Sequence, residues 1–211
     1  DILEVGVYRG KSLLSTAMLL KELGSDKKVY GFDSFSGFPP VYHEKDDPCA
    51  FNQLHESGKI TDAHLEAHNK LMKMTEFKKG FVPNAQTIST SNNFADTSDA
   101  VLEKKAKHLG LDNVVLVKGD FNETMQADQF IETRFMAVLM DCDLYASHLV
   151  ALPFAWDRMV TKSLMFLDEY YSLKFPGARI ACDEFFSKKD EKPTQYPIQE
   201  REFERWHAIK N

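Results

Sequence analysis

Acidic side chains follow several short apolar runs of this sequence, at the points where buried strands would end. In an open parallel sheet, ligands bind beyond the carboxyl ends of the strands, so acids at those ends are better candidates for function than acids elsewhere. Five acids follow the runs that we expect to form strands two to five: Asp33, Asp120, Asp141, Asp168 and Glu169. The chemistry they could support depends on which of them meet in the fold.

Three of these acids have the composition of a magnesium site. Asp141, Asp168 and Glu169 would lie at the ends of adjacent strands, and Mg²⁺ takes hard oxygen ligands while leaving positions open for water and substrate. A divalent ion there would lower the pKa of a bound hydroxyl. Asp143 would face the same way only if the strand continued past Asp141. Solvated strand ends or helix N-caps are the simpler interpretation of the same carboxylates.

A tight turn with two glycines follows the first apolar run. Glu4 lies in that run, and Gly6 and Gly10 flank a turn through which a backbone can approach a ligand closely. Asp33, about twenty residues further on, is placed to accept hydrogen bonds from both ribose hydroxyls. Because the full G-x-G-x-x-G pattern is missing, the turn favours an adenosine-type cofactor with an amino-acid tail over a pyrophosphate. The alternative is that the glycines only make a tight turn.

Two further pairs of residues are weaker candidates. His64 and His68 are one helical turn apart and could ligate a metal, but the local sequence offers no third ligand. A polar helix face is therefore the preferred interpretation of the histidines. Tyr145 and Ser147 could line a substrate cleft, although Tyr145 is equally suited to packing with a solvated hydroxyl.

Strands and helices alternate along the sequence, which predicts an α/β fold with a doubly wound, mostly parallel sheet. Strands are expected at 2–7, 29–32, 114–117, 135–140, 163–167 and 202–209, and helices at 12–23, 61–79, 99–109, 149–159 and 177–186. The stretch 41–97 breaks this alternation and holds four of the seven histidines. We expect it to be a helical lid inserted into a single domain that spans residues 1–211.

Composition narrows the class of protein. The 211 residues carry 26 basic and 32 acidic side chains, a formal charge of -6, which disfavours a nucleic-acid or anionic-lipid partner. There is no apolar run of membrane-spanning length. Cys49, Cys142 and Cys182 form neither a zinc pattern nor an even disulfide set, so a reducing, cytoplasmic setting is expected. The start at Asp1 predicts that an N-terminal segment, with a helix packed on the first strand, is missing.

Five strings of the sequence together resemble the macrocin O-methyltransferase (TylF-like) family, which methylates sugar hydroxyls in antibiotic biosynthesis. They are LEVGVYRG (3–10), GFDSFSGFP (31–39), LVKGDFNET (116–124), DCDLYAS (141–147) and PGARIACDEFF (176–186). The match keeps its order from Asp1 to about Phe186. It implies a class I methyltransferase fold with a seven-stranded sheet whose last strand is reversed, using S-adenosylmethionine and Mg²⁺.

The resemblance also implies roles for particular residues. Cofactor contacts fall on the first turn and on the ends of strands two to four: Glu4, Gly6, Tyr8 and Gly10 by the methionine part, Asp33 and Ser34 by the ribose, Asp120 and Phe121 by the adenine, and Asp141. Asp141, Asp168 and Glu169 would hold the metal, where the family commonly has two aspartates at the last two positions. Asp141 would also be the base that takes the hydroxyl proton.

The sequence therefore predicts a Mg²⁺-dependent O-methyltransferase acting on a hydroxyl of a sugar or a glycosylated natural product. A nicotinamide-dependent dehydrogenase shares the turn and Asp33 but does not need the acidic trio. A non-catalytic cofactor-binding module is the alternative outside the enzymes. The acceptor is expected to be a small molecule or glycoside, and a homo-oligomer or a place in a larger protein stays open.

Overall fold

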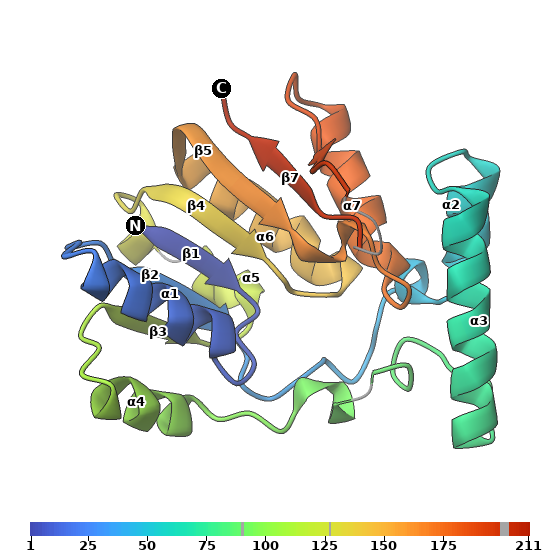
Figure 1. The fold of residues 1–211 in the computed structure, drawn as a ribbon, viewed down its shortest axis with the longest axis horizontal. Coiled ribbons are helices and arrows are strands. Elements are labelled where there is room, and N and C mark those ends of the chain that lie inside the picture. The colour runs from blue at the N-terminus through green and yellow to red at the C-terminus, as the bar shows by residue number, and fades with distance from the viewer. Residues whose placement is uncertain (90, 127, 199–202) are drawn as a thin grey trace.

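The computed structural model describes residues 1–89, 91–126, 128–198 and 203–211, and its centre is one seven-stranded sheet (Figure 1). The strands are β1 (Ile2–Val5), β2 (Val29–Asp33), β3 (Val114–Lys118), β4 (Phe135–Met140), β5 (Met159–Leu167), β6 (Thr194–Gln195) and β7 (Trp206–Ile209). Their order is β3-β2-β1-β4-β5-β7-β6. β7 runs antiparallel to β5 and to β6, and the other neighbours are parallel. The predicted seven-stranded sheet with a reversed strand is confirmed.

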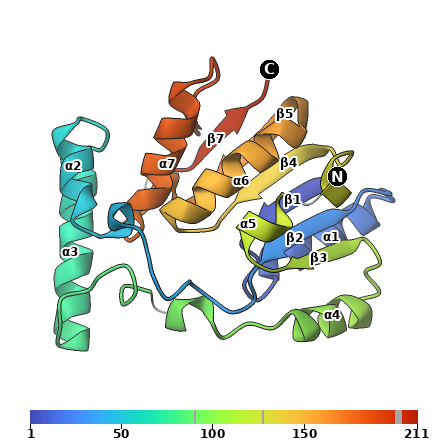
Figure 2. The ribbon, with the colours of Figure 1, turned by 180° about the vertical axis from the view of Figure 1, so that it is seen from behind.

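Helices cover both faces of this sheet (Figures 1 and 2). The helices of the described residues are α1 (Lys11–Glu22), α2 (Ala50–Glu56), α3 (Asp62–Lys79), α4 (Asp99–His108), α5 (Phe121–Thr124), α6 (Tyr145–Arg158) and α7 (Pro176–Ser187), with short 3-10 turns at η1 (Glu44–Asp46), η2 (Asn92–Phe94), η3 (Asp128–Phe130) and η4 (Asp168–Tyr170). Of these, α2 and α3 stand apart from the faces of the sheet (Figure 1). One apolar core joins α1 and α4 to the sheet, and a second core joins α6 and α7 to it. The two cores fix the carboxyl ends of the central strands in place.

The strand order reverses direction between β1 and β4. Leu3 pairs with Tyr30 of β2 on one side and with Val138 of β4 on the other. In doubly wound sheets, the loops on the two sides of such a reversal point away from each other and leave a crevice at the carboxyl ends. This is the expected place for a ligand.

The inserted region stands at one end of the sheet, next to α7 (Figure 1). α3 begins after Thr61, whose hydroxyl accepts a hydrogen bond from the His64 amide, and ends at the left-handed Gly80, as the sequence predicts. The prediction missed α2, because its seven residues are too short to show a helical period. No helix in the described ranges is long and apolar enough to span a bilayer.

Several predicted boundaries were wrong near the site. α6 begins at Tyr145 and not at 149, and β5 begins at Met159 and not at 163. The start of α6 is set by a distant residue, because the Tyr145 amide donates to the Asp46 carboxylate at 2.7 Å. The last strand spans only Trp206–Ile209, and position 202, where it was predicted to begin, lies outside the described residues.

Candidate active site

The turn after β1 touches the end of β4. Gly6 has a φ of 88°, and a Cβ placed on it would lie 1.8 Å from the Asp141 carbonyl oxygen. Its amide donates to the Phe32 carbonyl at 2.9 Å, while the Asp141 amide donates to the Val5 carbonyl at 2.9 Å. Only glycine allows this approach, which brings the turn and Asp141 to one point.

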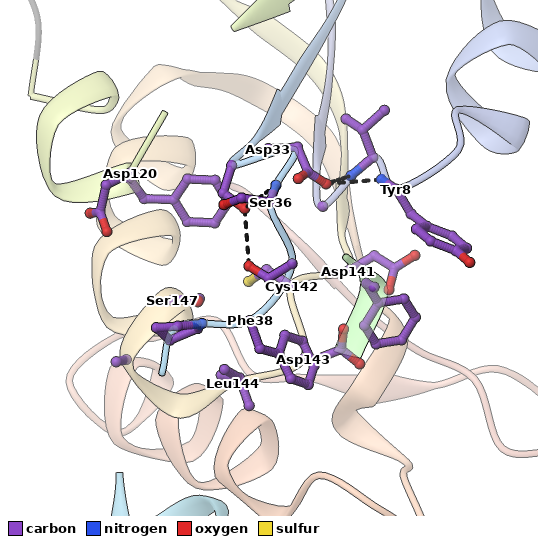
Figure 3. Close-up of a pocket in the computed structure, with 18 of the residues that line it drawn as sticks. Tyr8, Asp33, Ser36, Phe38, Asp120, Asp141, Cys142, Asp143, Leu144 and Ser147 are labelled. Atoms are coloured by element: carbon purple, nitrogen blue, oxygen red, sulfur yellow. Dashed lines mark hydrogen bonds between the residues drawn. The ribbon is translucent and has the colours of Figure 1, made fainter. Parts of the chain in front are cut away.

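Asp33, at the end of β2, holds the shape of this turn. Its Oδ2 accepts hydrogen bonds from the amides of Val7 at 2.7 Å and Tyr8 at 2.9 Å, and its Oδ1 accepts one from the Phe35 amide at 2.6 Å. Figure 3 shows Asp33 at the rim of the cavity with its carboxylate directed at the Tyr8 amide. The residue still lines the cavity. Both carboxylate oxygens of Asp33 therefore accept hydrogen bonds from the backbone of the turn and of the following loop.

Glu4 lies beneath the turn and is 2% exposed. The Ser12 hydroxyl donates to its carboxylate at 2.7 Å. Burial raises the pKa of Glu4 to about 7, and the hydrogen bond from Ser12 partly offsets this rise. Glu4 is absent from the cavity wall, and so is Gly10, which packs against Leu102.

A cavity of about 1050 Å³ opens at the reversal point of the sheet (Figure 3). It is lined by the turn after β1, the loop after β2, the start of α5 and the segment from Asp141 into α6. Of the predicted cofactor residues, those on the wall are Gly6, Tyr8, Asp33, Ser34, Asp120, Phe121 and Asp141. Ser12, Phe38 and Phe94 also line the cavity and were not predicted from the sequence. The two phenylalanines lie in irregular segments, where apolar residues give no periodic signal.

The predicted acidic trio comes together beside this cavity, whose wall includes Asp141 but neither Asp168 nor Glu169. One ligand atom from each of Asp141, Asp168 and Glu169 lies within 4.8 Å of the others. Burial, and then the Asp168 carboxylate, raise the pKa of Asp141. Glu169 Oε2 is buried without a hydrogen-bond partner. Two half-buried carboxylates and the exposed Asp168, close together and with one unsatisfied oxygen, fit a divalent cation, which would supply the missing positive charge.

Asp143 lies beside the trio, although the strand does not continue past Asp141 as that placement was expected to require. β4 ends at Met140, and Asp143 has a left-handed backbone with a φ of 58°. Its side chain is buried, and, after the burial of Glu169 itself, its carboxylate is one of the charges that raise the pKa of Glu169. Burial, and then Asp168, raise the pKa of Asp143. Asp143 therefore adds a fourth carboxylate beside the trio.

Tyr145 and Ser147, predicted as a possible pair in a substrate cleft, lie in different surroundings. Ser147 lines the cavity, whereas Tyr145 is buried and its hydroxyl donates to Glu184 at 2.7 Å. The ammonium of Lys45 donates to the same hydroxyl at 2.9 Å. The interpretation of Tyr145 as a packing residue fits this arrangement.

His64 and His68 do not lie on a polar helix face, and that interpretation was wrong. Both are buried, and their rings donate to backbone carbonyls: His64 Nε2 to Ser172 at 2.7 Å and His68 Nδ1 to Leu173 at 2.9 Å. The ring of Phe51 packs against both. The carbonyls satisfy the buried N–H groups, so the histidines dock α3 onto the loop that follows Asp168 and Glu169.

Comparison with known proteins gives the family. Residues 3–170 match the family described as "Methyltransferase domain", which is most of the chain. The chain belongs to the methyltransferase-domain family. Its fold is that of the class I, S-adenosylmethionine-dependent enzymes, which favours a transferase over the alternative of a nicotinamide-dependent dehydrogenase.

Individual proteins that are similar to this chain are also named as methyltransferases. Mycinamicin III 3''-O-methyltransferase from Micromonospora griseorubida is 25% identical over 188 residues, which cover 88% of this chain and 59% of that protein. The solved structure of the O-methyltransferase NovP has a TM-score of 0.67 at 18% identity, covering 100% of this chain and 71% of that one. The calicheamicin methyltransferase CalS11 gives 0.65 at 20%, with 97% and 70% covered. The two structures establish the fold.

Proposed function

We propose that this methyltransferase transfers the methyl group of S-adenosylmethionine to a hydroxyl of a sugar-containing small molecule. The observation that carries the proposal is the meeting of the acidic trio with the cavity at Asp141. A hydroxyl held at the trio would then lie next to the turn after β1, where the cofactor is expected. The reacting groups would be held at a single point, which is what methyl transfer needs most.

The walls of the cavity suit the three parts of the cofactor. Gly6 and Tyr8 would face the methionine part, and Asp33 and Ser34 the ribose. Asp120 and Phe121, at the end of β3, would face the adenine. Glu4 and Gly10 would support the cavity wall without touching the cofactor. Glu4 accepts a hydrogen bond from the Ser12 hydroxyl, and Gly10 lets α4 pack close to the turn.

Asp141, Asp168 and Glu169 would hold Mg²⁺. When bound, the ion supplies positive charge that lowers the pKa of the acceptor hydroxyl. The carboxylate of Asp141 would take the hydroxyl proton as the C–O bond forms and the C–S bond of the sulfonium breaks. Asp33 would hold the turn in register for in-line attack through its bonds to Val7 and Tyr8.

A sugar-containing acceptor is supported by the relatives. The curated relative is named for a mycinamicin 3''-hydroxyl, and a CalS11 structure is described as a TDP-rhamnose 3'-O-methyltransferase. This chain spans 59% of the length of the curated relative, so its acceptor is part of the proposal.

Replacing Asp141 by Asn tests the proposed chemistry. We expect turnover with TDP-rhamnose or mycinamicin III, in the presence of Mg²⁺, to fall by about 10²–10⁴-fold because the base is lost. Cofactor affinity, measured by calorimetric titration with S-adenosylmethionine and with NAD as the negative control, should change little. The exposed Asp112→Asn is the matched control and should behave as the wild type.

Two outcomes would contradict the proposal. An Asp141→Asn variant with full activity would show that neither the base nor the ion is held there. Binding of S-adenosylmethionine without turnover of any hydroxyl acceptor would favour the non-catalytic cofactor-binding module.

A further inference from the structure

Four aromatic rings form a row beside the cavity, defined here as the aromatic row: Tyr8, Phe94, Phe38 and Phe175. The Tyr8 and Phe94 ring centroids are 5.2 Å apart in an edge-to-face contact, and those of Phe94 and Phe38 are also 5.2 Å apart. Phe38 and Phe175 follow at 5.7 Å, again edge to face. Such contacts hold rings in fixed orientations.

The aromatic row connects the two halves of the proposed reaction centre. Tyr8 belongs to the turn after β1, and Phe175 ends the loop that follows Asp168 and Glu169. Phe175 is buried with Leu144, whereas Tyr8, Phe38 and Phe94 line the cavity. Asp120, at the expected adenine end, lies across the cavity from Tyr8 in Figure 3. These three half-buried rings would therefore face the space between the methionine part of a bound cofactor and Asp141.

Phe94 is held in the row by a strained backbone. Asn92, Asn93 and Phe94 are three consecutive residues with left-handed φ values of 50°, 51° and 60°. Asparagine tolerates this conformation, but a bulky aromatic residue rarely adopts it. Strain of this kind persists where the surroundings impose it, often beside ligand sites.

The surroundings that impose it are the turn and the loop after β2. Asp96 accepts hydrogen bonds from the Tyr8 hydroxyl at 2.7 Å and from the Arg9 guanidinium, and the Thr97 hydroxyl donates to the Tyr8 carbonyl. The Phe38 amide donates to the Asn93 carbonyl at 2.9 Å. Gly37 permits this approach, because its Cβ would lie 2.6 Å from that oxygen. The strap, residues 92–97, thus fixes Phe94 against Tyr8 and Phe38.

We propose that Phe94 and Phe38 are specificity-determining residues, which take the apolar C–H face of the acceptor's sugar ring. The inference rests on the proposed function, since it places the sugar between cofactor and trio. The negative face of an aromatic ring attracts the weakly positive C–H groups on one side of a pyranose. The hydroxyls on the other side remain free to reach Asp141. The row therefore selects an acceptor that has both an apolar and a polar face.

The test measures binding of two probes, TDP-rhamnose and methyl α-rhamnopyranoside, in the presence of Mg²⁺ and S-adenosylhomocysteine. Calorimetry gives affinities, and saturation-transfer NMR identifies the sugar protons that contact aromatic side chains. We expect transfer to ring C–H protons, and a loss of probe affinity of about tenfold in Phe94→Leu and in Phe38→Leu, which corresponds to about 1.4 kcal/mol. Phe94→Tyr, which keeps the ring, should restore the affinity.

Measuring the affinity for S-adenosylmethionine distinguishes a failure of this inference from a failure of the proposed function. S-adenosylmethionine should bind Phe94→Leu within about twofold of the wild type, and the exposed Phe77→Leu on α3 should change neither affinity. An equal loss of cofactor and probe affinity would overturn the inference, as would unchanged probe affinity in both Leu variants or no probe binding by the wild type. Failure of the wild type to bind S-adenosylmethionine would instead overturn the proposed function.

Discussion

Gly6 shows how a single missing side chain decides the geometry of the site. Its absent Cβ leaves room for the Asp141 carbonyl, so the turn after β1 meets the end of β4 at Asp141. Any larger residue must either move the turn or separate β1 from β4 at their carboxyl ends. Both changes would displace Asp141 relative to the cavity.

We expect Gly6→Ala to lower the free energy of unfolding by about 2–5 kcal/mol, from overpacking and an unfavourable positive φ. Denaturant unfolding monitored by fluorescence gives the value. Gly58→Ala is the matched control, because Gly58 also has a positive φ, 69°, but has no atom within 4 Å of its Cβ position. Equal losses in the two variants would mean that the close approach to Asp141 contributes nothing.

At the residue scale, the sequence predicts position better than it predicts contacts. Acids at the ends of neighbouring parallel strands must lie near one another, and the structure brings Asp141, Asp168 and Glu169 together. The three bonds from backbone amides to Asp33 could not be predicted, because they depend on the path of the turn. The position of Phe94 at the cavity could not be predicted either, because it depends on three consecutive residues with a left-handed backbone.

Among the elements, α6 depends on a residue from the inserted region. Asp46 supplies the acceptor for the Tyr145 amide at the first turn of α6, since Leu144 makes no side-chain cap. Asp46 Oδ2 is buried without a partner, and Gly177 of α7 lies so close that its Cβ would be 2.0 Å from Oδ1. Burial raises the pKa of Asp46 to about 6.

A raised pKa means that the Asp46 carboxyl binds its proton more tightly in the folded chain than in the unfolded chain. The contribution of Asp46 to stability is therefore greatest below its ordinary pKa of 3.8 and is lost as the pH rises through about 6. Asn keeps the acceptor for Tyr145 and carries no charge. We expect the free energy of unfolding of the wild type to fall, relative to Asp46→Asn, by up to about 3 kcal/mol between pH 4 and pH 7.

Urea unfolding of both proteins at several pH values measures this difference. The exposed Asp112→Asn should give a much flatter curve against the wild type. If the Asp46→Asn curve were equally flat, the buried carboxylate would not be the source of the pH dependence. This distant cap also explains why the start of α6 was predicted wrongly, because Asp46 lies almost a hundred residues before Tyr145 in the sequence.

Repulsion between the carboxylates of the acidic trio lowers the stability of the folded chain, and a bound cation should relieve it. Burial and the neighbouring Asp143 raise the pKa of Glu169 well above its ordinary value, so bringing the carboxylates together opposes folding. An ion bound there would stabilise the native state by mass action, about 2.7 kcal/mol at a hundred times its Kd. For a chain of this length, that raises Tm by roughly 5–10 °C.

Thermal unfolding with Mg²⁺ or with EDTA tests this expectation. Glu169→Gln keeps the shape of the side chain, should raise Tm in EDTA and should lose most of the response to Mg²⁺. Glu66→Gln, on the exposed face of α3, is the matched control and should respond as the wild type does. A Mg²⁺ response that survived Glu169→Gln would place the ion elsewhere.

The position of β1 also matters for how the chain acquires its shape. β1 and β2 are close in the sequence, at Ile2–Val5 and Val29–Asp33, whereas the other neighbour of β1 is β4, at Phe135–Met140. Contacts between such distant segments cost loop-closure entropy and form slowly. The cavity straddles this junction, with Asp33 on the early half and Asp141 on the late one. The nascent chain therefore has no complete cavity until β4 has been synthesised and has paired with β1.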